Sequence, residues 1–146
     1  MKRLVVLILA LTPIFTFSQG APKLEIDWIP LEKAKKYAKK YDKNILIFFY
    51  KKDCEYCEKM KKETLNNMQV VNLINNNFLP VQIDSRTKDT IYYKGEKYAN
   101  QQPVEHGYTF RHDFYAEVAS FTRDNIEQST TPAIVLFNTK FEKLKN

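Results

Sequence analysis

Residues 44–57 read Asn-Ile-Leu-Ile-Phe-Phe-Tyr-Lys-Lys-Asp-Cys-Glu-Tyr-Cys, an almost continuous apolar run that leads into the only two cysteines of the chain. Such a run is typical of a central strand covered on both faces. The residues after Cys54 have a helical composition, with Met60 and Leu65 able to face inward and lysines outward. The cysteine pair is therefore expected where a strand turns into a helix, a context that favours a redox dithiol.

The spacing of Cys54 and Cys57 suits thiol–disulfide chemistry. A thiolate in the first turn of a helix is stabilised by unpaired backbone N–H groups and by the positive end of the helix dipole. A cysteine three residues later lies on the same side, close enough to form a disulfide. The first cysteine of such motifs has a pKa lowered from about 8.5 to between about 3.5 and 7.5. We predict that Cys54 attacks as the nucleophile and that Cys57 resolves the mixed disulfide.

Two other interpretations of the cysteine pair are an inert surface disulfide and half of a zinc site. Structural zinc takes four ligands, so the other two would have to be His106 and His112, whose separation fits no common zinc spacing. We expect His106 in a loop and His112 near a helix start, each in a surface or capping role.

The first residues have the pattern of a secretory signal peptide. Met1-Lys2-Arg3 is followed by an uncharged apolar run from Leu4 to Phe15 and by small or polar residues up to Ser18. We expect cleavage between Ser18 and Gln19, which would leave an exported, periplasmic domain of residues 19–146. An uncleaved leader would instead act as a membrane anchor.

Composition limits the class of protein. The 146 residues carry a net charge of +6, which falls to about +4 without Lys2 and Arg3. Acidic residues are interleaved with the lysines, so nucleic-acid binding gains little support. The 128 residues after the leader suit one domain with one hydrophobic core. An exported chain with one close cysteine pair is not a disulfide-stapled scaffold.

Hydrophobic periodicity predicts alternating strands and helices along the chain. The expected elements are a strand or extended lead-in over 24–29, a helix over 31–41, a strand over 44–50, helices over 54–65 and 68–74 separated by Asn66-Asn67, a strand over 78–84, a hairpin over 90–99, a helix over 113–123, a strand over 133–137 and an edge strand over 141–146. This order predicts an α/β protein in which helices cover the faces of a sheet.

The Cys-x-x-Cys turn, together with Thr131-Pro132 directly before the strand over 133–137, resembles the thioredoxin superfamily. The resemblance covers roughly residues 24–138 and includes Trp28 and the helix over 31–41. The chain is most similar to exported bacterial thioredoxin-like proteins, including the group related to SoxW and the thioredoxin-like domains of periplasmic disulfide reductases. This resemblance implies a thioredoxin-like fold, a central mixed β-sheet flanked by helices, with the hairpin over 90–99 as an insertion.

The resemblance also implies roles for individual residues. Cys54 corresponds to the family's nucleophile and Cys57 to its resolving cysteine. Pro132 corresponds to the family's cis-proline, and the backbone of Thr131 before it would pair with an extended substrate peptide. The redox-active Cys54–Cys57 disulfide would be the only redox group, with no other cofactor and no metal.

The chain departs from thioredoxin around the cysteines. Phe48 stands where thioredoxins have a buried aspartate that assists proton transfer, and Glu58 is a candidate to replace that carboxylate. The dipeptide is Glu55-Tyr56 rather than Gly-Pro, and Asp53 stands where thioredoxins have Trp. A tyrosine at the second position also occurs in glutaredoxins, but their accompanying proline is absent.

A further departure lies at the end of the chain. The family's closing helix has no counterpart before Asn146. Either the chain is a truncated version of the family's domain, or something else covers the sheet face on which that helix would pack.

Charges around Cys54 bear on the direction of the reaction. Asp53 and Glu55 oppose thiolate formation, whereas Lys51, Lys52 and Lys59 favour it. A disfavoured thiolate makes a reductant, so the two nearest neighbours favour a reductase. We expect an exported oxidoreductase that reduces protein disulfides and receives electrons from a membrane disulfide reductase. The alternatives are a disulfide oxidase or isomerase, and a non-catalytic module that binds a partner protein or a soft metal such as copper(I).

Overall fold

A computed structural model describes residues 25–101, 103, 105 and 110–144 of the chain. The expected leader over 1–18, Leu24 of the lead-in and His106 lie outside these residues. Within the part of the chain that is described, no helix is long and apolar enough to cross a bilayer.

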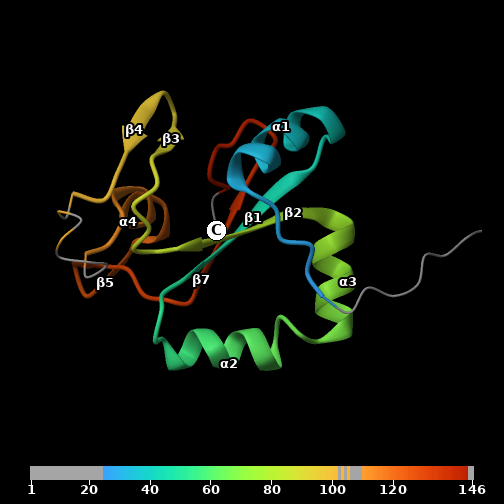
Figure 1. The fold of residues 1–146 in the computed structure, drawn as a ribbon, viewed down its shortest axis with the longest axis horizontal. Coiled ribbons are helices and arrows are strands. Elements are labelled where there is room, and N and C mark those ends of the chain that lie inside the picture. Colours follow the sequence, from blue (N-terminus) through green and yellow to red (C-terminus); the bar gives the residue numbers. More distant parts are fainter. Residues whose placement is uncertain (1–24, 102, 104, 106–109, 145–146) are drawn as a thin grey trace, which may run out of the picture.

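A three-stranded mixed sheet forms the centre of the molecule (Figure 1). Strand β1 (Asn44–Tyr50) lies between β2 (Phe78–Asp84) and β7 (Ala133–Phe137). Strand β2 pairs with β1 in parallel and β7 pairs with it antiparallel, with Tyr50 opposite Asp84 and Phe49 opposite Ala133. This register brings the ends of β1 and β2 and the start of β7 to the same edge of the sheet.

Four helices of the described residues surround this sheet. Helix α1 (Leu31–Tyr41) begins after Pro30, α2 (Glu55–Glu63) follows Cys54, α3 (Met68–Asn77) follows Asn67, and α4 (Asp113–Ala119) follows His112. The Asn67 side chain accepts hydrogen bonds from the amides of Gln69 and Val70. Asn67 therefore caps the amino terminus of α3, directly after the break that separates α3 from α2.

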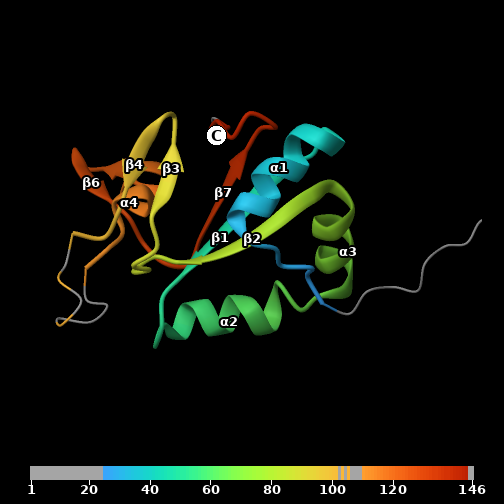
Figure 2. The same cartoon turned by 45° about the horizontal axis from the view of Figure 1, so that its top comes forward.

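The two faces of the sheet are covered by different elements, as Figures 1 and 2 show. The first face carries Ile45, Ile47 and Phe49 of β1 and packs against α1, α4 and a short hairpin. The second face carries Leu46 and Phe48 and packs against α3, the end of α2 and the lead-in before α1. This alternation explains why residues 45–49 of β1 are all apolar.

Two short hairpins follow β2. The first joins β3 (Ile91–Tyr93) to β4 (Glu96–Tyr98) through Lys94 and Gly95, both with positive φ. Two successive residues in this conformation form the tight turn whose twist matches a hairpin. The second joins β5 (Phe121–Arg123) to β6 (Ile126–Gln128) through Asp124 and Asn125, again with positive φ.

The predicted fold class is confirmed, and most elements lie where they were expected. The bounds of α1, β1, β2 and β7 and the hairpin of β3 and β4 agree with the predictions. Residues 25–30 form no strand, and the Ile29 amide donates to the Pro80 carbonyl at 2.9 Å.

The helix predicted over 113–123 is wrong in its second half. Helix α4 ends at Ala119, Ser120 is extended, and residues 121–123 form β5. Phe121, the first residue of β5, is 45% exposed. The Asp124-Asn125 turn, whose residue types tolerate positive φ, pairs this segment with β6 instead.

Three other boundaries differ from the predictions. Helix α2 ends at Glu63 rather than Leu65, and α3 ends at Asn77 rather than at residue 74. Asn77 donates to the Leu73 carbonyl at 2.8 Å, which satisfies an acceptor in the last turn of α3. In place of the edge strand over 141–146, the described residues have a single bridge between Lys143 and Phe137.

Candidate active site

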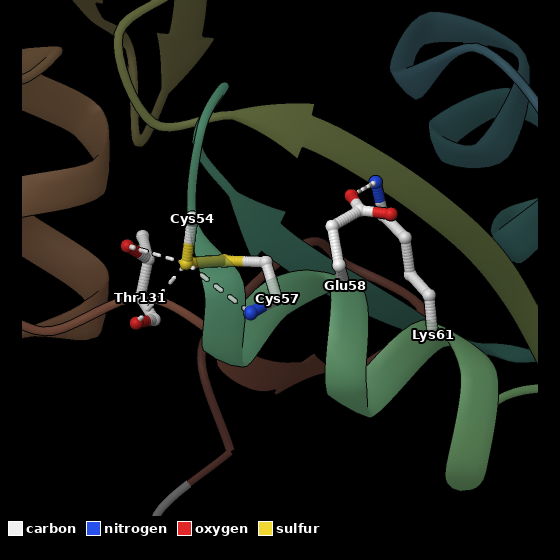
Figure 3. A network of polar contacts seen from close by, with 5 residues as sticks. All are labelled: Cys54, Cys57, Glu58, Lys61 and Thr131. Atoms are coloured by element: carbon white, nitrogen blue, oxygen red, sulfur yellow. Dashed lines mark hydrogen bonds and ion pairs between the residues drawn. A yellow bond between two sulfur atoms is a disulfide. The ribbon is translucent and has the colours of Figure 1, made fainter.

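A disulfide joins Cys54 and Cys57 at the start of α2, with their Cα atoms 5.2 Å apart (Figure 3). Strand β1 ends four residues before Cys54, and Asp53, with a φ of 58°, turns the chain into the helix. Cys54 is the N-cap of α2, and its Sγ accepts a hydrogen bond from the Cys57 amide at 3.2 Å. The pair therefore lies at the strand-to-helix turn that the sequence indicated.

The two sulfur atoms have different surroundings. Cys57 is fully buried, whereas 6% of Cys54 is exposed. The capping hydrogen bond places a backbone donor on Cys54 Sγ at the positive end of α2, which stabilises negative charge there. The geometry thus favours Cys54 as the sulfur that carries the charge and meets a substrate.

The Thr131–Pro132 peptide bond is cis. Thr131, which directly precedes β7, contacts the Cys54 sulfur. Cys54 Sγ lies 3.7 Å from the Thr131 carbonyl oxygen and 3.8 Å from its Oγ1 (Figure 3). The sheet register causes this proximity, because β7 starts at the edge where β1 ends. A substrate chain lying along Thr131 would have its backbone next to Cys54.

The charged residues around the disulfide are mostly exposed. Asp53, Glu55 and Tyr56 all lie at the surface, with Tyr56 73% exposed. Glu58 forms an ion pair with Lys61 at 2.9 Å, and Figure 3 shows its carboxylate directed toward that lysine rather than toward the sulfur atoms. The structure therefore gives Glu58 a partner of its own.

Phe48 occupies the position of the thioredoxin aspartate without any polar function. Its ring is fully buried, 6.0 Å from the Trp28 ring and 6.2 Å from the Tyr50 ring. This side chain contributes to the core of the second face.

His112 has the capping role that was expected, and it is buried rather than at the surface. Its Nδ1 accepts from the Phe114 amide at 3.1 Å, and its Nε2 lies 2.8 Å from the Asp89 carbonyl oxygen. Both ring nitrogens are thus engaged in holding the start of α4. Within the described ranges, no group of three His, Cys, Asp or Glu side chains is placed to hold a metal ion.

Two hollows adjoin the disulfide, and the Thr130–Thr131 segment lines both. The first, which we call the apolar groove, has a volume of about 640 Å³ and is lined by α2 and the start of β7, including Tyr56, Met60 and Pro132. The second, which we call the basic cleft, has a volume of about 510 Å³. Its lining residues are Lys51, Ser85, Arg86, Phe110, Arg111, Tyr115, Ser129, Thr130 and Thr131.

Sequence reasoning missed Arg86 and Arg111 as residues of the site. Arg86 follows β2, and Arg111 precedes α4, so both lie far in sequence from the cysteines. The signal for Arg86 was available, because parallel strands bring the residues after their carboxyl ends together. Arg111 had no comparable signal, since its place depends on how the segment after the hairpin packs.

Hydroxyl groups form part of the basic cleft. Arg111 donates to Ser129 Oγ, and Ser129 is also hydrogen-bonded to Tyr115. Burial raises the pKa of the Tyr115 phenol, although the Ser129 hydrogen bond and the Arg111 charge both act to lower it. The phenol therefore stays protonated at neutral pH and can donate a hydrogen bond.

Comparison with known proteins gives two sequence relatives of low identity. Anterior gradient protein 3 of Mus musculus is 27% identical over 66 residues, which is 44% of this chain and 40% of that protein. An uncharacterized protein of Archaeoglobus fulgidus is 28% identical over 87 residues, 60% of this chain and 67% of that protein. The matched region thus spans less than half of the mouse relative.

Two solved structures have a similar fold. A DsbH oxidoreductase matches with a TM-score of 0.54 and 18% identity, covering 88% of this chain and 78% of the other. A disulphide isomerase from Xylella fastidiosa Temecula1 matches with a TM-score of 0.50 and 20% identity, covering 84% and 79%. At this level of identity the likeness concerns the fold.

The family comparison covers most of the chain. A family model described as thioredoxin-like matches residues 27–139, a range that includes the sheet, the Cys54–Cys57 disulfide and the cis-proline Pro132. The chain therefore belongs to the thioredoxin-like family.

Proposed function

We propose that this protein is an exported thiol–disulfide oxidoreductase that reduces protein disulfides through Cys54 and Cys57. The observation that carries the proposal is the placement of Cys54 Sγ. This sulfur caps α2, accepts a hydrogen bond from the Cys57 amide, and contacts Thr131 beside the cis peptide bond.

The reaction follows from this placement. In the reduced protein the Cys54 thiolate attacks one sulfur of a substrate disulfide, forming a mixed disulfide and releasing the other substrate sulfur as a thiolate that takes up a proton. Cys57 then loses its proton and attacks Cys54 Sγ, which releases the second substrate thiol and forms the Cys54–Cys57 disulfide. Two electrons pass from the protein dithiol to the substrate, and an external dithiol must restore them.

The burial of the two cysteines supports this division of roles. Cys54 is the one with exposed surface and the capping hydrogen bond, while Cys57 is enclosed and three residues away on the same helix. An incoming disulfide can reach Cys54 Sγ, and Cys57 is then placed to release it. Thr131 would align the substrate backbone along the start of β7.

The two residues next to Cys54 in the sequence support the reducing direction, whereas the nearby lysines and arginines act against it. The residues on either side of Cys54 are Asp53 and Glu55, whose carboxylates oppose the thiolate that the helix start favours. A less stable thiolate makes a stronger reductant. Tyr56 and Glu58 complete the surface around the motif and would adjust this balance.

Export and the electron source are further parts of the proposal. They rest on the charged, apolar and small-residue segments before Gln19, and on the likeness of the motif region to SoxW-related proteins and periplasmic reductase domains. A membrane disulfide reductase would return electrons to Cys54 and Cys57. Sequencing the amino terminus of the protein recovered from a secreting host would show whether the chain begins at Gln19.

The reduction potential of the cysteine pair tests the direction. The purified protein is equilibrated with dithiothreitol or glutathione at defined ratios, and free thiols are then trapped. A potential near that of thioredoxin, about −270 mV, supports a reductase, whereas one near about −120 mV would replace this proposal with a disulfide oxidase.

Single cysteine variants test the roles of the two thiols. Cys57→Ser is expected to accumulate a stable mixed disulfide with a substrate protein, because no thiol remains to release it. Cys54→Ser serves as the matched control and is expected to trap none. Equal trapping by both variants would contradict the assignment of Cys54 as the nucleophile.

A further inference from the structure

The basic cleft is connected to the Cys54 sulfur through Thr131. Thr131, which contacts Cys54 Sγ at 3.7 Å, forms part of its wall, and Lys51, three residues before Cys54, forms another. Ser85 and Arg86 after β2 and Arg111 before α4 also line the cleft. A group bound in this cleft would therefore be a neighbour of the sulfur that attacks the substrate.

The sheet builds this cleft from separate parts of the chain. Tyr50 and Asp84 are paired at the ends of β1 and β2, so Lys51 and Ser85 leave the sheet side by side. The Ser85 amide donates to the Tyr50 carbonyl at 2.7 Å, and the Ser85 carbonyl accepts from the His112 amide at 2.8 Å. These bonds hold the lining loops and the start of α4 at fixed positions around the hollow.

The charged residues described along the cleft are all of one sign. Lys51, Arg86 and Arg111 are lining residues, and none of the described residues that line it carries a carboxylate. Asp84, next in sequence to Ser85, lines a different cavity together with Asp89 and Glu32. Of the ion pairs formed by the described residues, none involves Lys51 or Arg86.

A concave surface of this kind selects anions. A hollow lined by one sign of charge concentrates the field and raises the local concentration and association rate of oppositely charged ligands. Arginine donates two parallel hydrogen bonds to a carboxylate, and the hydrogen-bonded pair of Ser129 and Tyr115 hydroxyls leaves one O–H that can donate to a ligand. The apolar groove on the other side of Thr131 differs, because its charged lining residues, Lys59 and Glu63, are of opposite sign.

We propose that the basic cleft binds a carboxylate of the disulfide substrate, so that the preferred substrates carry an acidic group close to the sulfur that Cys54 attacks. The inference rests on the proposed function, because it names the substrate class for that same site. The carboxylate can come from an Asp or Glu side chain of a substrate protein or from a small acidic disulfide, and the recognition chemistry is the same.

Small disulfides of equal size and different charge test the proposal. The reduced protein is mixed with excess dithiodiglycolate, hydroxyethyl disulfide or cystamine, and oxidation of its cysteines in one turnover is followed by acid quenching and thiol alkylation. Each rate is divided by the rate of the same disulfide with free dithiothreitol, which removes differences in intrinsic reactivity. At low ionic strength the anion is expected to exceed the neutral compound about 5–10-fold, and the cation to react more slowly than either.

High salt and matched variants test whether the preference for the anionic disulfide comes from the charges of the basic cleft. High salt is expected to reduce the ratio of anion to neutral rates to below about 2-fold, because it screens the cleft. Arg86→Gln is expected to lower the ratio, and Arg86→Lys to retain most of it. Arg123→Gln makes the same charge change on exposed β5, outside the cleft, and is expected to leave the ratio unchanged.

A second assay with disulfide peptides distinguishes the two sources of the carboxylate, an acidic side chain of a substrate protein and a small acidic disulfide. Disulfide peptides that differ only in Asp, Asn or Lys beside the cysteine are compared in the same assay. A preference for Asp in the peptides without one for dithiodiglycolate supports acidic protein segments as the source, and a preference in both extends it to small acidic disulfides. Equal normalised rates for all charges would overturn the inference while leaving the oxidoreductase intact, and failure to reduce even hydroxyethyl disulfide would instead overturn the proposed function.

Discussion

The first face of the central sheet is more fully covered than the second. On the first face α1, α4, β3 and the ring of Phe141 enclose the side chains of all three strands. On the second face the buried cluster is smaller and is completed by partly exposed residues such as Trp28 and Tyr50. Toward β7 this face is open, since Ile134 is 43% exposed.

The difference separates what holds the fold from what performs the chemistry. The Cys54–Cys57 disulfide, the proposed reactive group, begins α2 on the side of the second face, and the apolar groove lies between α2 and the start of β7. The first face has no part in lining that groove. We therefore expect substitutions on the first face to cost the most stability, and substitutions near the open end of the second face to cost little.

Phe49 and Phe48 are neighbours on β1 that point to opposite faces, and both are fully buried. Phe49→Ala is expected to lower the free energy of unfolding by about 3–5 kcal/mol, because Phe114 and Tyr115 hold the cavity open. Phe48→Ala is expected to cost about 1 kcal/mol less, since Trp28 and Tyr50 are partly exposed and can move into the space. Urea unfolding measures both, and equal losses would contradict the comparison.

Tyr93 tests whether the inserted hairpin is part of the first face. Its ring packs edge-on against Phe114, Phe137 and Phe141 at centroid distances of 5.4, 5.9 and 5.5 Å. Tyr93→Ala is therefore expected to lower the free energy of unfolding by about 3 kcal/mol, measured by calorimetry.

The control for the hairpin is its neighbour Tyr92, which is 58% exposed. Tyr92→Ala is expected to change the free energy of unfolding by less than about 0.5 kcal/mol. If Tyr93→Ala and Tyr92→Ala were equally stable, the hairpin would contribute nothing to the hydrophobic core.

Val135 and Ile134 make the corresponding pair on β7. Val135 is 7% exposed on the first face, whereas Ile134 is 43% exposed on the second. Val135→Ala is expected to cost about 2 kcal/mol and Ile134→Ala less than about 0.5 kcal/mol, although isoleucine loses more atoms. Chemical denaturation of the two variants checks the order, and a larger loss for Ile134→Ala would show that the open end is covered.

Asn67 provides a smaller test on the second face. Its side chain caps α3 through the amides of Gln69 and Val70, so Asn67→Ala is expected to cost about 1 kcal/mol. Hydrogen exchange should show faster exchange at those two amides. Asn66→Ala, at the exposed position before it, is the matched control and is expected to leave both amides unchanged.

The agreement between prediction and structure depends on how local the signal is. Strand β1 is a continuous apolar run, and α1 repeats small or apolar residues at helical spacing, so their bounds follow from periodicity. Residues 121–123 carry one aromatic among polar residues, a pattern compatible with either a helix end or a short strand. Pairing with β6 decided the outcome there, and a pairing partner is not visible in a short window.

The active site shows the same division between local and distant signals. Cys54, Cys57, Thr131 and Pro132 stand in two short motifs, and the sheet brings both motifs to one edge. Glu58 was a reasonable candidate by sequence distance, yet its rotamer pairs it with Lys61. Sequence proximity alone does not determine where a long side chain points.

The chain's local patterns determine the strand–cysteine–helix unit, the thioredoxin-like fold class and the choice of Cys54 and Cys57 as the candidate reactive pair, because these depend on backbone geometry over a few residues. Tertiary packing decides the rest. Through this packing, the Tyr93 ring contacts the aromatic residues of the first face, and His112 caps α4 from a buried position. The same packing places Lys51, Arg86 and Arg111 around one cleft. Those arrangements depend on contacts between segments far apart in sequence, whose free energy is gained only once the sheet has brought them together.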